Sequence, residues 1–130
     1  MRLLVDTHVF LWYVSDDPRL PRAFGESIRD PAFEVFLSVA SIWEVVIKHG
    51  LGRLPLPAPP AEYLPLQRKR HRIESLPLDE TTFPFLAGLP ALHRDPFDRI
   101  LIAQALQHDL MLVTVDDAVR QYAVRLLPQT

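Results

Sequence analysis

The sequence predicts an α/β fold, a three-layer α/β/α arrangement with a mainly parallel central sheet. Two short apolar segments each end in an aspartate: Arg2–Val5 before Asp6, and Met111–Val115 before Asp116. Such segments are typical of buried parallel strands that deliver their last residues to strand-to-helix loops. Strand and helix signals also alternate along the chain, which favours a parallel sheet covered by helices. We expect one domain over residues 1–130, because a chain of this length buries roughly two-thirds of its unfolded surface.

The N-terminal half is predicted to contain two strands and three helical segments. The first strand leads into an apolar segment with Asp6 at its N-cap position, and Asp16-Asp17-Pro18 interrupts the chain after it. A short helix ends at Pro31, and Ser38 or Ser41 is placed to cap the helix after the second strand. The predicted bounds are Arg2–Val5, Val9–Val14, Pro21–Arg29, Glu34–Ser38 and Ala40–Gly50.

The C-terminal half opens with Leu51–Pro60, which holds four of the thirteen prolines. We expect it to be a stiff, extended connector that lies against the body of the domain. Asp79 and Asp117 are placed to cap short helices, and Asp95 before Pro96 is typical of an N-cap followed by proline at the first helical position. The predicted bounds are Ala61–Lys69, Ile73–Leu76, Asp79–Gly88, Pro96–His108, Met111–Val115, Ala118–Tyr122 and Val124–Leu127.

The composition excludes several classes of protein. Hydrophobic residues make up 48% of the chain and charged residues 23%, which is ordinary for a globular protein and too apolar for disorder. The absence of cysteine excludes disulfides and thiolate metal sites, and it fits a reducing cytoplasm. The apolar start reaches Asp6 too early for a signal sequence, and no apolar run is long enough to span a bilayer. We expect a soluble, cytoplasmic protein that does not contact membranes.

Four acids are predicted to meet at the carboxyl edge of the sheet. Asp6 and Asp116 follow strands, Asp98 lies in the first turn of a helix, and Glu44 lies one turn into the helix that follows the second strand. Like charges placed so close together raise each other's pKa unless a cation holds them. Oxygen ligands without histidine or cysteine suit Mg²⁺ or Mn²⁺, as one or two ions. This arrangement favours metal-assisted hydrolysis of a phosphodiester, although Asp98 and Asp6 taken singly are also ordinary residues at helix starts.

Polar residues near these acids have two interpretations. Ser41, Glu44 and Lys48 share one face of a helix. They form either an exposed ion pair or a polar stripe that faces a cleft. The rest of this helix is apolar, so we expect it to be largely buried. Thr114, on the same strand face as Asp116, is placed to hold a carboxylate or a metal-bound water.

The formal charge of −2 argues against nucleic-acid binding by bulk electrostatics. If four acids bind metal, however, the remaining surface has a formal charge of +2. The densest basic run, Arg68–Arg72, is either a solvated helix end or an edge that contacts phosphate, and two arginines flank Asp98. The candidate phosphate or RNA contacts are Arg68, Lys69, Arg70, Arg94 and Arg99.

Four motifs occur in order along the chain. They are Leu3-Leu4-Val5-Asp6-Thr7-His8, Ser41-x-x-Glu44, His93–Arg99 followed by Ile102–Ala105, and Leu112–Asp116. This combination, from Met1 to about Leu127, resembles PIN domains of the VapC toxin type. The resemblance implies a PIN-like fold and an endoribonuclease that uses Mg²⁺ or Mn²⁺ and leaves a 5′-phosphate and a 3′-hydroxyl. It also implies a homodimer that is restrained by a small VapB-like antitoxin.

The resemblance assigns roles by position. Asp6, Glu44, Asp98 and Asp116 match the catalytic and metal-binding acids, Thr114 matches a strand-end hydroxyl, and Thr7 and Ser41 are supporting neighbours. Asp95 we assign to the helix cap.

Three other interpretations stay open. The chain has five histidines that could supply a general acid and base. Nothing pairs them, and we expect only His8 to lie beside a proposed catalytic residue. A phosphatase with Asp6 as nucleophile would require a second acid two residues later, but that position is His8. A non-catalytic RNA- or partner-binding module, in which the acids only cap helices, is the alternative function.

Overall fold

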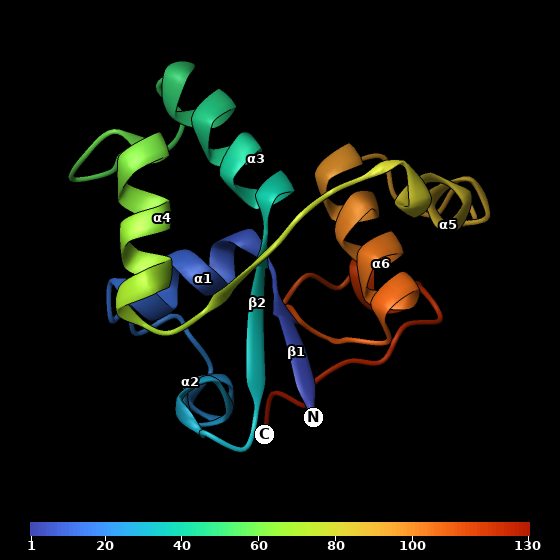
Figure 1. Cartoon of the computed structure of the whole chain (residues 1–130), viewed down its shortest axis with the longest axis horizontal. Coiled ribbons are helices and arrows are strands. Elements are labelled where there is room, and N and C mark those ends of the chain that lie inside the picture. The colour runs from blue at the N-terminus through green and yellow to red at the C-terminus, as the bar shows by residue number, and fades with distance from the viewer.

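A computed structural model describes residues 1–130 and contains a four-stranded sheet between layers of helices (Figure 1). In chain order the elements are β1 (Arg2–Val5), α1 (Thr7–Val14), α2 (Arg22–Arg29), β2 (Glu34–Ser38), α3 (Val39–Gly50), α4 (Pro60–Arg70), β3 (Glu74–Leu76), η1 (Glu80–Thr82), α5 (Phe83–Ala87), α6 (Pro96–His108), β4 (Met111–Val113) and η2 (Val119–Gln121). The α/β/α fold class predicted from the sequence is confirmed.

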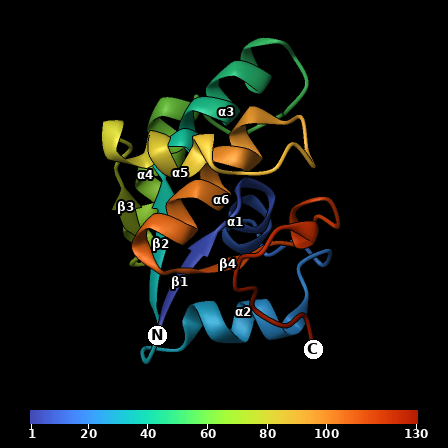
Figure 2. The same ribbon diagram turned by 90° about the vertical axis from the view of Figure 1, so that its right-hand side faces the viewer.

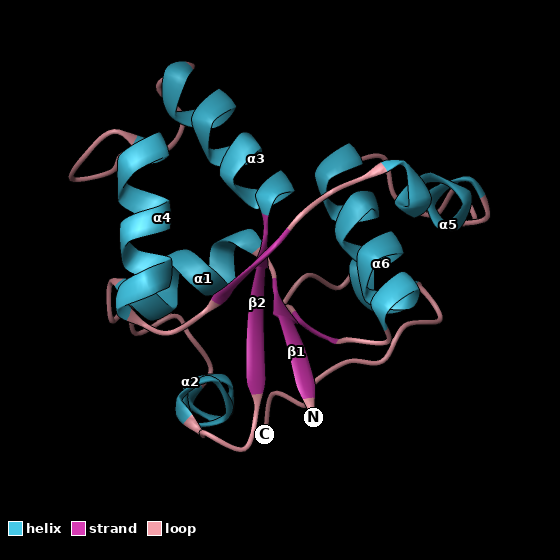
Figure 3. Ribbon diagram, in the orientation of Figure 1, coloured by secondary structure: helices cyan, strands magenta, loops and turns pink.

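The sheet is parallel throughout, with the strand order β3-β2-β1-β4. In the register of the central strands, Leu4 of β1 lies opposite Phe36 of β2 and Leu112 of β4. All carboxyl ends therefore meet at one edge. Both α1 and α3 start at this edge, directly after β1 and β2 (Figure 3).

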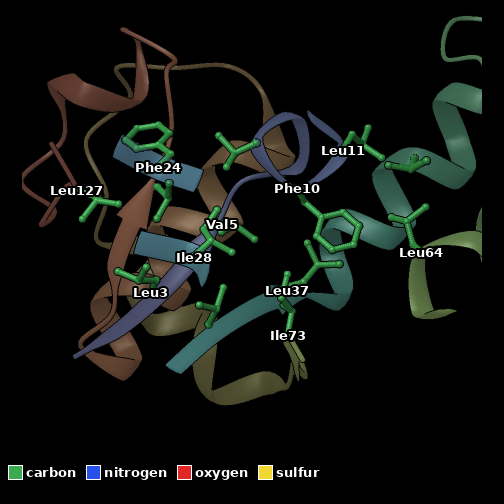
Figure 4. Packing of buried hydrophobic residues seen from close by; sticks show 14 residues of the cluster. Leu3, Val5, Phe10, Leu11, Phe24, Ile28, Leu37, Leu64, Ile73 and Leu127 are labelled. Carbon is green, nitrogen blue, oxygen red and sulfur yellow. The ribbon is translucent and has the colours of Figure 1, made fainter. Parts of the chain in front are cut away.

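Successive side chains along each strand point to opposite faces of the sheet, and a hydrophobic core lies on each face. Leu3 and Val5 pack with Phe10 and Phe24 of helices α1 and α2 in one core (Figure 4). Leu4 faces the opposite side and belongs to the core beneath α6. Because the strands are short and apolar on both faces, helices must cover both sides of the sheet.

The proline-rich connector lies against the body, as predicted, because Leu54 and Leu56 pack onto the core beside α1. The predicted helix over Asp79–Gly88 is instead a 3₁₀ turn followed by the five-residue α5. Asp79 still caps its start by accepting a hydrogen bond from the Thr81 N–H (2.9 Å). No helix in the structure is both long and apolar enough to cross a membrane.

Two predicted strands are shorter in the structure. The strand that begins at Met111 ends at Val113 rather than Val115, because the chain turns where the Thr114 hydroxyl accepts a hydrogen bond from the Asp116 N–H (3.1 Å). The predicted strand over Val124–Leu127 is reduced to a single bridge between Leu126 and Leu112.

The expectation that α3 is largely buried is wrong. Trp43 is 56% exposed, and Val46 and Ile47 are also exposed. The helix projects beyond the carboxyl ends of the strands, at the opposite end of the molecule from α2 (Figure 2). Only the face that carries Ala40, Ser41, Glu44 and Val45 is therefore covered.

Candidate metal centre

The carboxyl edge of the sheet is hollowed by a cavity of about 280 Å³, which we call the acidic cleft. It lies among α1, α3, the start of α6 and the loop after β4. Its lining residues are Asp6, Thr7, His8, Trp12, Glu44, Lys48, Asp95, Asp98, Val115 and Asp116. All four acids predicted from the sequence therefore line one cavity.

Asp6 ends β1 and is 8% exposed. Its Oδ1 accepts a hydrogen bond from the Val9 N–H (2.8 Å), which makes Asp6 the N-cap of α1. Burial, and to a lesser degree the nearby carboxylates of Glu44 and Asp116, raise the pKa of this carboxyl to about 6, against the lowering effect of hydrogen bonds from the Thr114 side chain and the Val9 N–H. Asp6 is both a helix cap and a lining residue of the cleft.

Glu44 is 3% exposed and is held by two side chains. The Thr7 hydroxyl donates to its Oε1 (2.7 Å), and the Lys48 ammonium donates to Oε2. Thr7 Oγ1 also lies 2.9 Å from the Ser41 hydroxyl. Since Thr7 has one hydroxyl proton, Ser41 must donate to Thr7, which in turn donates to Glu44. The predicted supporting residues Thr7 and Ser41 therefore fix the carboxylate.

The polar stripe of α3 thus faces the cleft and not bulk solvent. Lys48 lines the cleft beside Glu44. Partial burial acts to lower the pKa of Lys48, but the hydrogen bond that Lys48 donates to Glu44 and the charges of Glu44, Asp95 and Asp98 raise it overall. Lys48 is therefore a fixed positive charge within the acidic cleft.

Asp98 lies in the first turn of α6, where Asp95 caps the helix by accepting from the Phe97 N–H (2.9 Å). Burial raises the pKa of Asp98 to about 6, against the lowering effect of a hydrogen bond from His93, while the charges of Asp95, Asp116 and Glu44 raise it. The predicted cap role of Asp95 is confirmed, although Asp95 also lines the cleft.

Asp116 lies in the loop after β4. Its Oδ1 accepts a hydrogen bond from the Ala118 N–H (2.9 Å). The prediction that Asp117 makes the capping contact is therefore wrong by one residue. The Thr114 hydroxyl accepts from the Asp116 N–H, and its interaction with the Asp6 carboxyl acts to lower the pKa of Asp6. The predicted strand-end hydroxyl connects two of the acids.

Sequence reasoning missed His93, which we expected to lie apart from the acids. Its Nε2 lies 2.8 Å from Asp98 Oδ2 and 3.8 Å from Asp116 Oδ2. The three groups offer ligand atoms that all lie within 4.8 Å of one another. The available signal was the position of His93 in the loop five residues before Asp98, within the motif itself.

The predicted phosphate contacts lie elsewhere. Arg99 Nη1 donates to the Pro90 carbonyl (2.9 Å) and to the Tyr122 hydroxyl (3.0 Å), and Arg94 and Arg99 line a separate cavity beside α5. The segment Arg68, Lys69 and Arg70 forms the last turn of α4. It lies near the C-terminal end of α1, where Tyr13 packs on His71, and none of its three residues lines the cleft. Any phosphate contact by these residues would therefore fall outside the acidic cleft.

The donor set of the cleft fits a small divalent cation. Carboxylate oxygens converge there, and the pKa values of Asp6 and Asp98 are raised to about 6 by burial and by the charges of neighbouring carboxylates, among them Glu44 and Asp116. Among the lining residues, Lys48 is the one permanently charged cation. Oxygen-rich sites of this kind match the preferences of Mg²⁺ and Mn²⁺. A bound cation would relieve the repulsion that the carboxylates create.

Comparison with known proteins matches this chain to a protein family. A family model described as PIN domain matches residues 3–125. Ribonuclease VapC22 from Mycobacterium tuberculosis is 26% identical over 121 residues, 92% of this chain and 91% of that protein. Ribonuclease VapC16 from the same organism is 38% identical over 58 residues, 45% of this chain and 39% of that protein.

Solved structures agree in fold. VapBC2 from Rickettsia felis, bound to a promoter DNA fragment, superposes with a TM-score of 0.73 at 13% identity, covering 98% of both chains. VapBC-1 from nontypeable Haemophilus influenzae gives a TM-score of 0.68 at 15% identity, covering 99% of this chain and 98% of that chain. With the family model matching almost the whole chain, this protein belongs to the PIN domain family.

Proposed function

We propose that this protein is an endoribonuclease that depends on Mg²⁺ or Mn²⁺ and acts as the toxin of a toxin–antitoxin pair. The observation that carries the proposal is the convergence of Asp6, Glu44, Asp98 and Asp116 on one cleft. The names of the relatives, which are VapC ribonucleases, support an RNA substrate.

The four acids would hold one or two divalent cations, which would activate water and stabilise the leaving oxygen of a phosphodiester. Thr7 and Ser41 hold Glu44 in place, and Thr114 joins Asp6 to the loop that carries Asp116. His93 orients the Asp98 carboxylate. These contacts hold the carboxylates in place before a substrate binds. Metal ligands are commonly oriented in this way by neighbouring hydrogen bonds.

The proposal includes a partner. Solved structures of the same fold are VapB–VapC complexes, so we propose that a small VapB-like antitoxin restrains the activity. We also propose that the protein forms a homodimer and is located in the cytoplasm.

The test is cleavage of end-labelled total RNA by the purified protein in Mn²⁺ and in EDTA, with Asp98→Asn and Asp6→Asn in Mn²⁺. Asp117→Asn is the matched control, because Asp117 is exposed and lies outside the cleft. We expect discrete products with 5′-phosphates from the wild type and the control in Mn²⁺ alone. Circular dichroism should show that both inactive variants remain folded.

Three outcomes would contradict the proposal. Cleavage in EDTA would point to metal-free histidine chemistry. Wild-type rates from either cleft variant would remove the acids from the reaction. No product under any condition would favour the non-catalytic RNA- or partner-binding module.

A further inference from the structure

A second hollow, of about 450 Å³, adjoins the acidic cleft. We call it the aromatic hollow. Its walls come from α1, the loop that carries Arg19, the connector over residues 54–57 and Tyr63 at the start of α4. Its volume exceeds that of the acidic cleft, and no role proposed so far uses it.

The two cavities share a wall. His8 and Trp12 lie one turn apart on α1 and line both of them. Their ring centroids are 6.2 Å apart. Because Asp6 caps the start of α1, a polymer with a phosphate at the carboxylates can pass over these two rings into the aromatic hollow.

The chemistry of the hollow suits a flat aromatic group better than a phosphate. The guanidinium carbon of Arg19 lies 5.2 Å from the centre of the Trp12 ring. Asp17 holds this guanidinium with two hydrogen bonds, from Nε to Oδ1 (3.1 Å) and from Nη2 to Oδ2 (2.7 Å). The ion pair fixes the orientation of Arg19 and cancels its charge, so the hollow offers planar faces without a net positive charge.

Unpaired nucleobases bind to surfaces of this kind. In single-stranded RNA recognition, bases stack on aromatic side chains and on guanidinium planes. Trp12 supplies an indole face, Arg19 a guanidinium plane and Tyr63 a further ring, while Leu54 and Leu56 add apolar wall. A base that stacks on these surfaces is held through its flat face, so the hollow does not have to supply hydrogen-bond donors to a phosphate.

We propose that the aromatic hollow holds one nucleobase of a single-stranded RNA substrate, close to the nucleotide whose phosphate lies at the acidic cleft. The inference rests on the proposed nuclease function, which supplies the RNA. The hollow then sets the distance between the held base and the scissile bond, so it contributes to the choice of cleavage site.

The first experiment measures binding of fluorescein-labelled eight-nucleotide RNAs by anisotropy, with Ca²⁺ in place of Mg²⁺ and intact strands checked on a gel. We expect Trp12→Ala to raise the Kd about tenfold or more, the usual effect of losing one stacked base. Trp12→Phe, which keeps an aromatic face, should stay within about threefold. Trp43→Ala is the matched control, because Trp43 is the other tryptophan of the chain and lies outside the hollow.

An abasic nucleotide moved along the strand identifies the held base. At one position, loss of the base should weaken binding to the wild type and add nothing to the defect of Trp12→Ala. Purely additive effects at every position, or wild-type affinity of Trp12→Ala, would overturn the proposal. The proposal would also be overturned if Trp12→Ala keeps its RNA affinity and instead loses affinity for a protein partner.

A second measurement covers the case in which Trp12→Ala does not fold. Trp43→Phe leaves Trp12 as the only tryptophan, and its fluorescence should be quenched by the RNA. Unchanged fluorescence at saturating RNA would overturn the proposal. If the wild type shows the position-dependent effect of the abasic nucleotide but does not cleave RNA, the proposed nuclease function is refuted and base binding in the aromatic hollow is supported. If Trp12→Ala cleaves RNA in a metal-dependent way with an unchanged KM, base binding in the hollow is refuted and the nuclease function is not.

Discussion

Replacing Asp6 by Asn should stabilise the metal-free protein at alkaline pH and have little effect near pH 4. The pKa of Asp6 is raised from 3.8 to about 6, chiefly by burial. Asn at this position keeps the cap of α1, since Asn and Asp are equally good N-caps. The substitution therefore removes a buried charge and leaves the local hydrogen bond to Val9 in place.

The sign follows from proton binding. Between the unfolded pKa of 3.8 and the folded pKa of about 6, the folded state binds more protons than the unfolded state, so the wild type loses stability as pH rises. Above pH 6 the loss is complete. A shift of about two pKa units corresponds to roughly 3 kcal/mol. For a chain of this length, 1 kcal/mol changes Tm by about 4 °C, so the variant should gain up to about 10 °C between pH 4 and pH 8.

The assay is thermal unfolding followed by circular dichroism in EDTA from pH 4 to pH 8. Asp117→Asn is again the control, because Asp117 is exposed and lies outside the cleft. Adding Mn²⁺ at pH 8 should raise the Tm of the wild type by mass action and raise that of Asp6→Asn much less. Parallel pH profiles for wild type and Asp6→Asn, or equal stabilisation by Mn²⁺, would refute the argument that the cleft stores uncompensated negative charge.

Two further substitutions test the surroundings of the site. Thr7→Val removes the hydroxyl that donates to Glu44 and should weaken Mn²⁺ binding, measured by calorimetry, about tenfold or more. Thr7→Ser should restore it, and an unchanged affinity in Thr7→Val would show that Glu44 needs no such support. Arg70→Ala should weaken RNA binding and lower the slope of log K against log salt by about one if the end of α4 contacts phosphate. An unchanged slope would make that run a solvated helix end.

The elements around the site were predictable because their signals are local. The apolar run before Asp6 and the Asp95-Pro96 pair each specify a strand end or a helix start within a few residues. A parallel sheet then brings separate strand ends to one edge whatever the loops between them do. The convergence of the acids follows from topology and needs no knowledge of side-chain contacts.

The features that sequence reasoning missed depend on longer-range packing. His93 reaches Asp98 and Asp116 from an irregular loop, and no periodic pattern fixes the conformation of such a loop. The exposure of Trp43 on α3 depends on how far that helix extends past the sheet, which its own amphipathic pattern does not specify. The capping contact falls to Asp116 and not to Asp117 because the Thr114 hydroxyl holds the Asp116 N–H and sets the turn one residue earlier.

The structure also removes an apparent choice between structural and functional roles for these acids. Asp6 Oδ1 is bonded to the Val9 N–H, Asp116 Oδ1 to the Ala118 N–H and Glu44 Oε1 to the Thr7 hydroxyl. Each carboxylate thus has at least one oxygen held by a hydrogen bond, and in Glu44 the second oxygen also accepts from Lys48. The same hydrogen bonds that cap a helix and close a turn therefore restrict the orientation of the Asp6 and Asp116 carboxylates, and a metal centre built in this way needs little reorganisation when its ion binds.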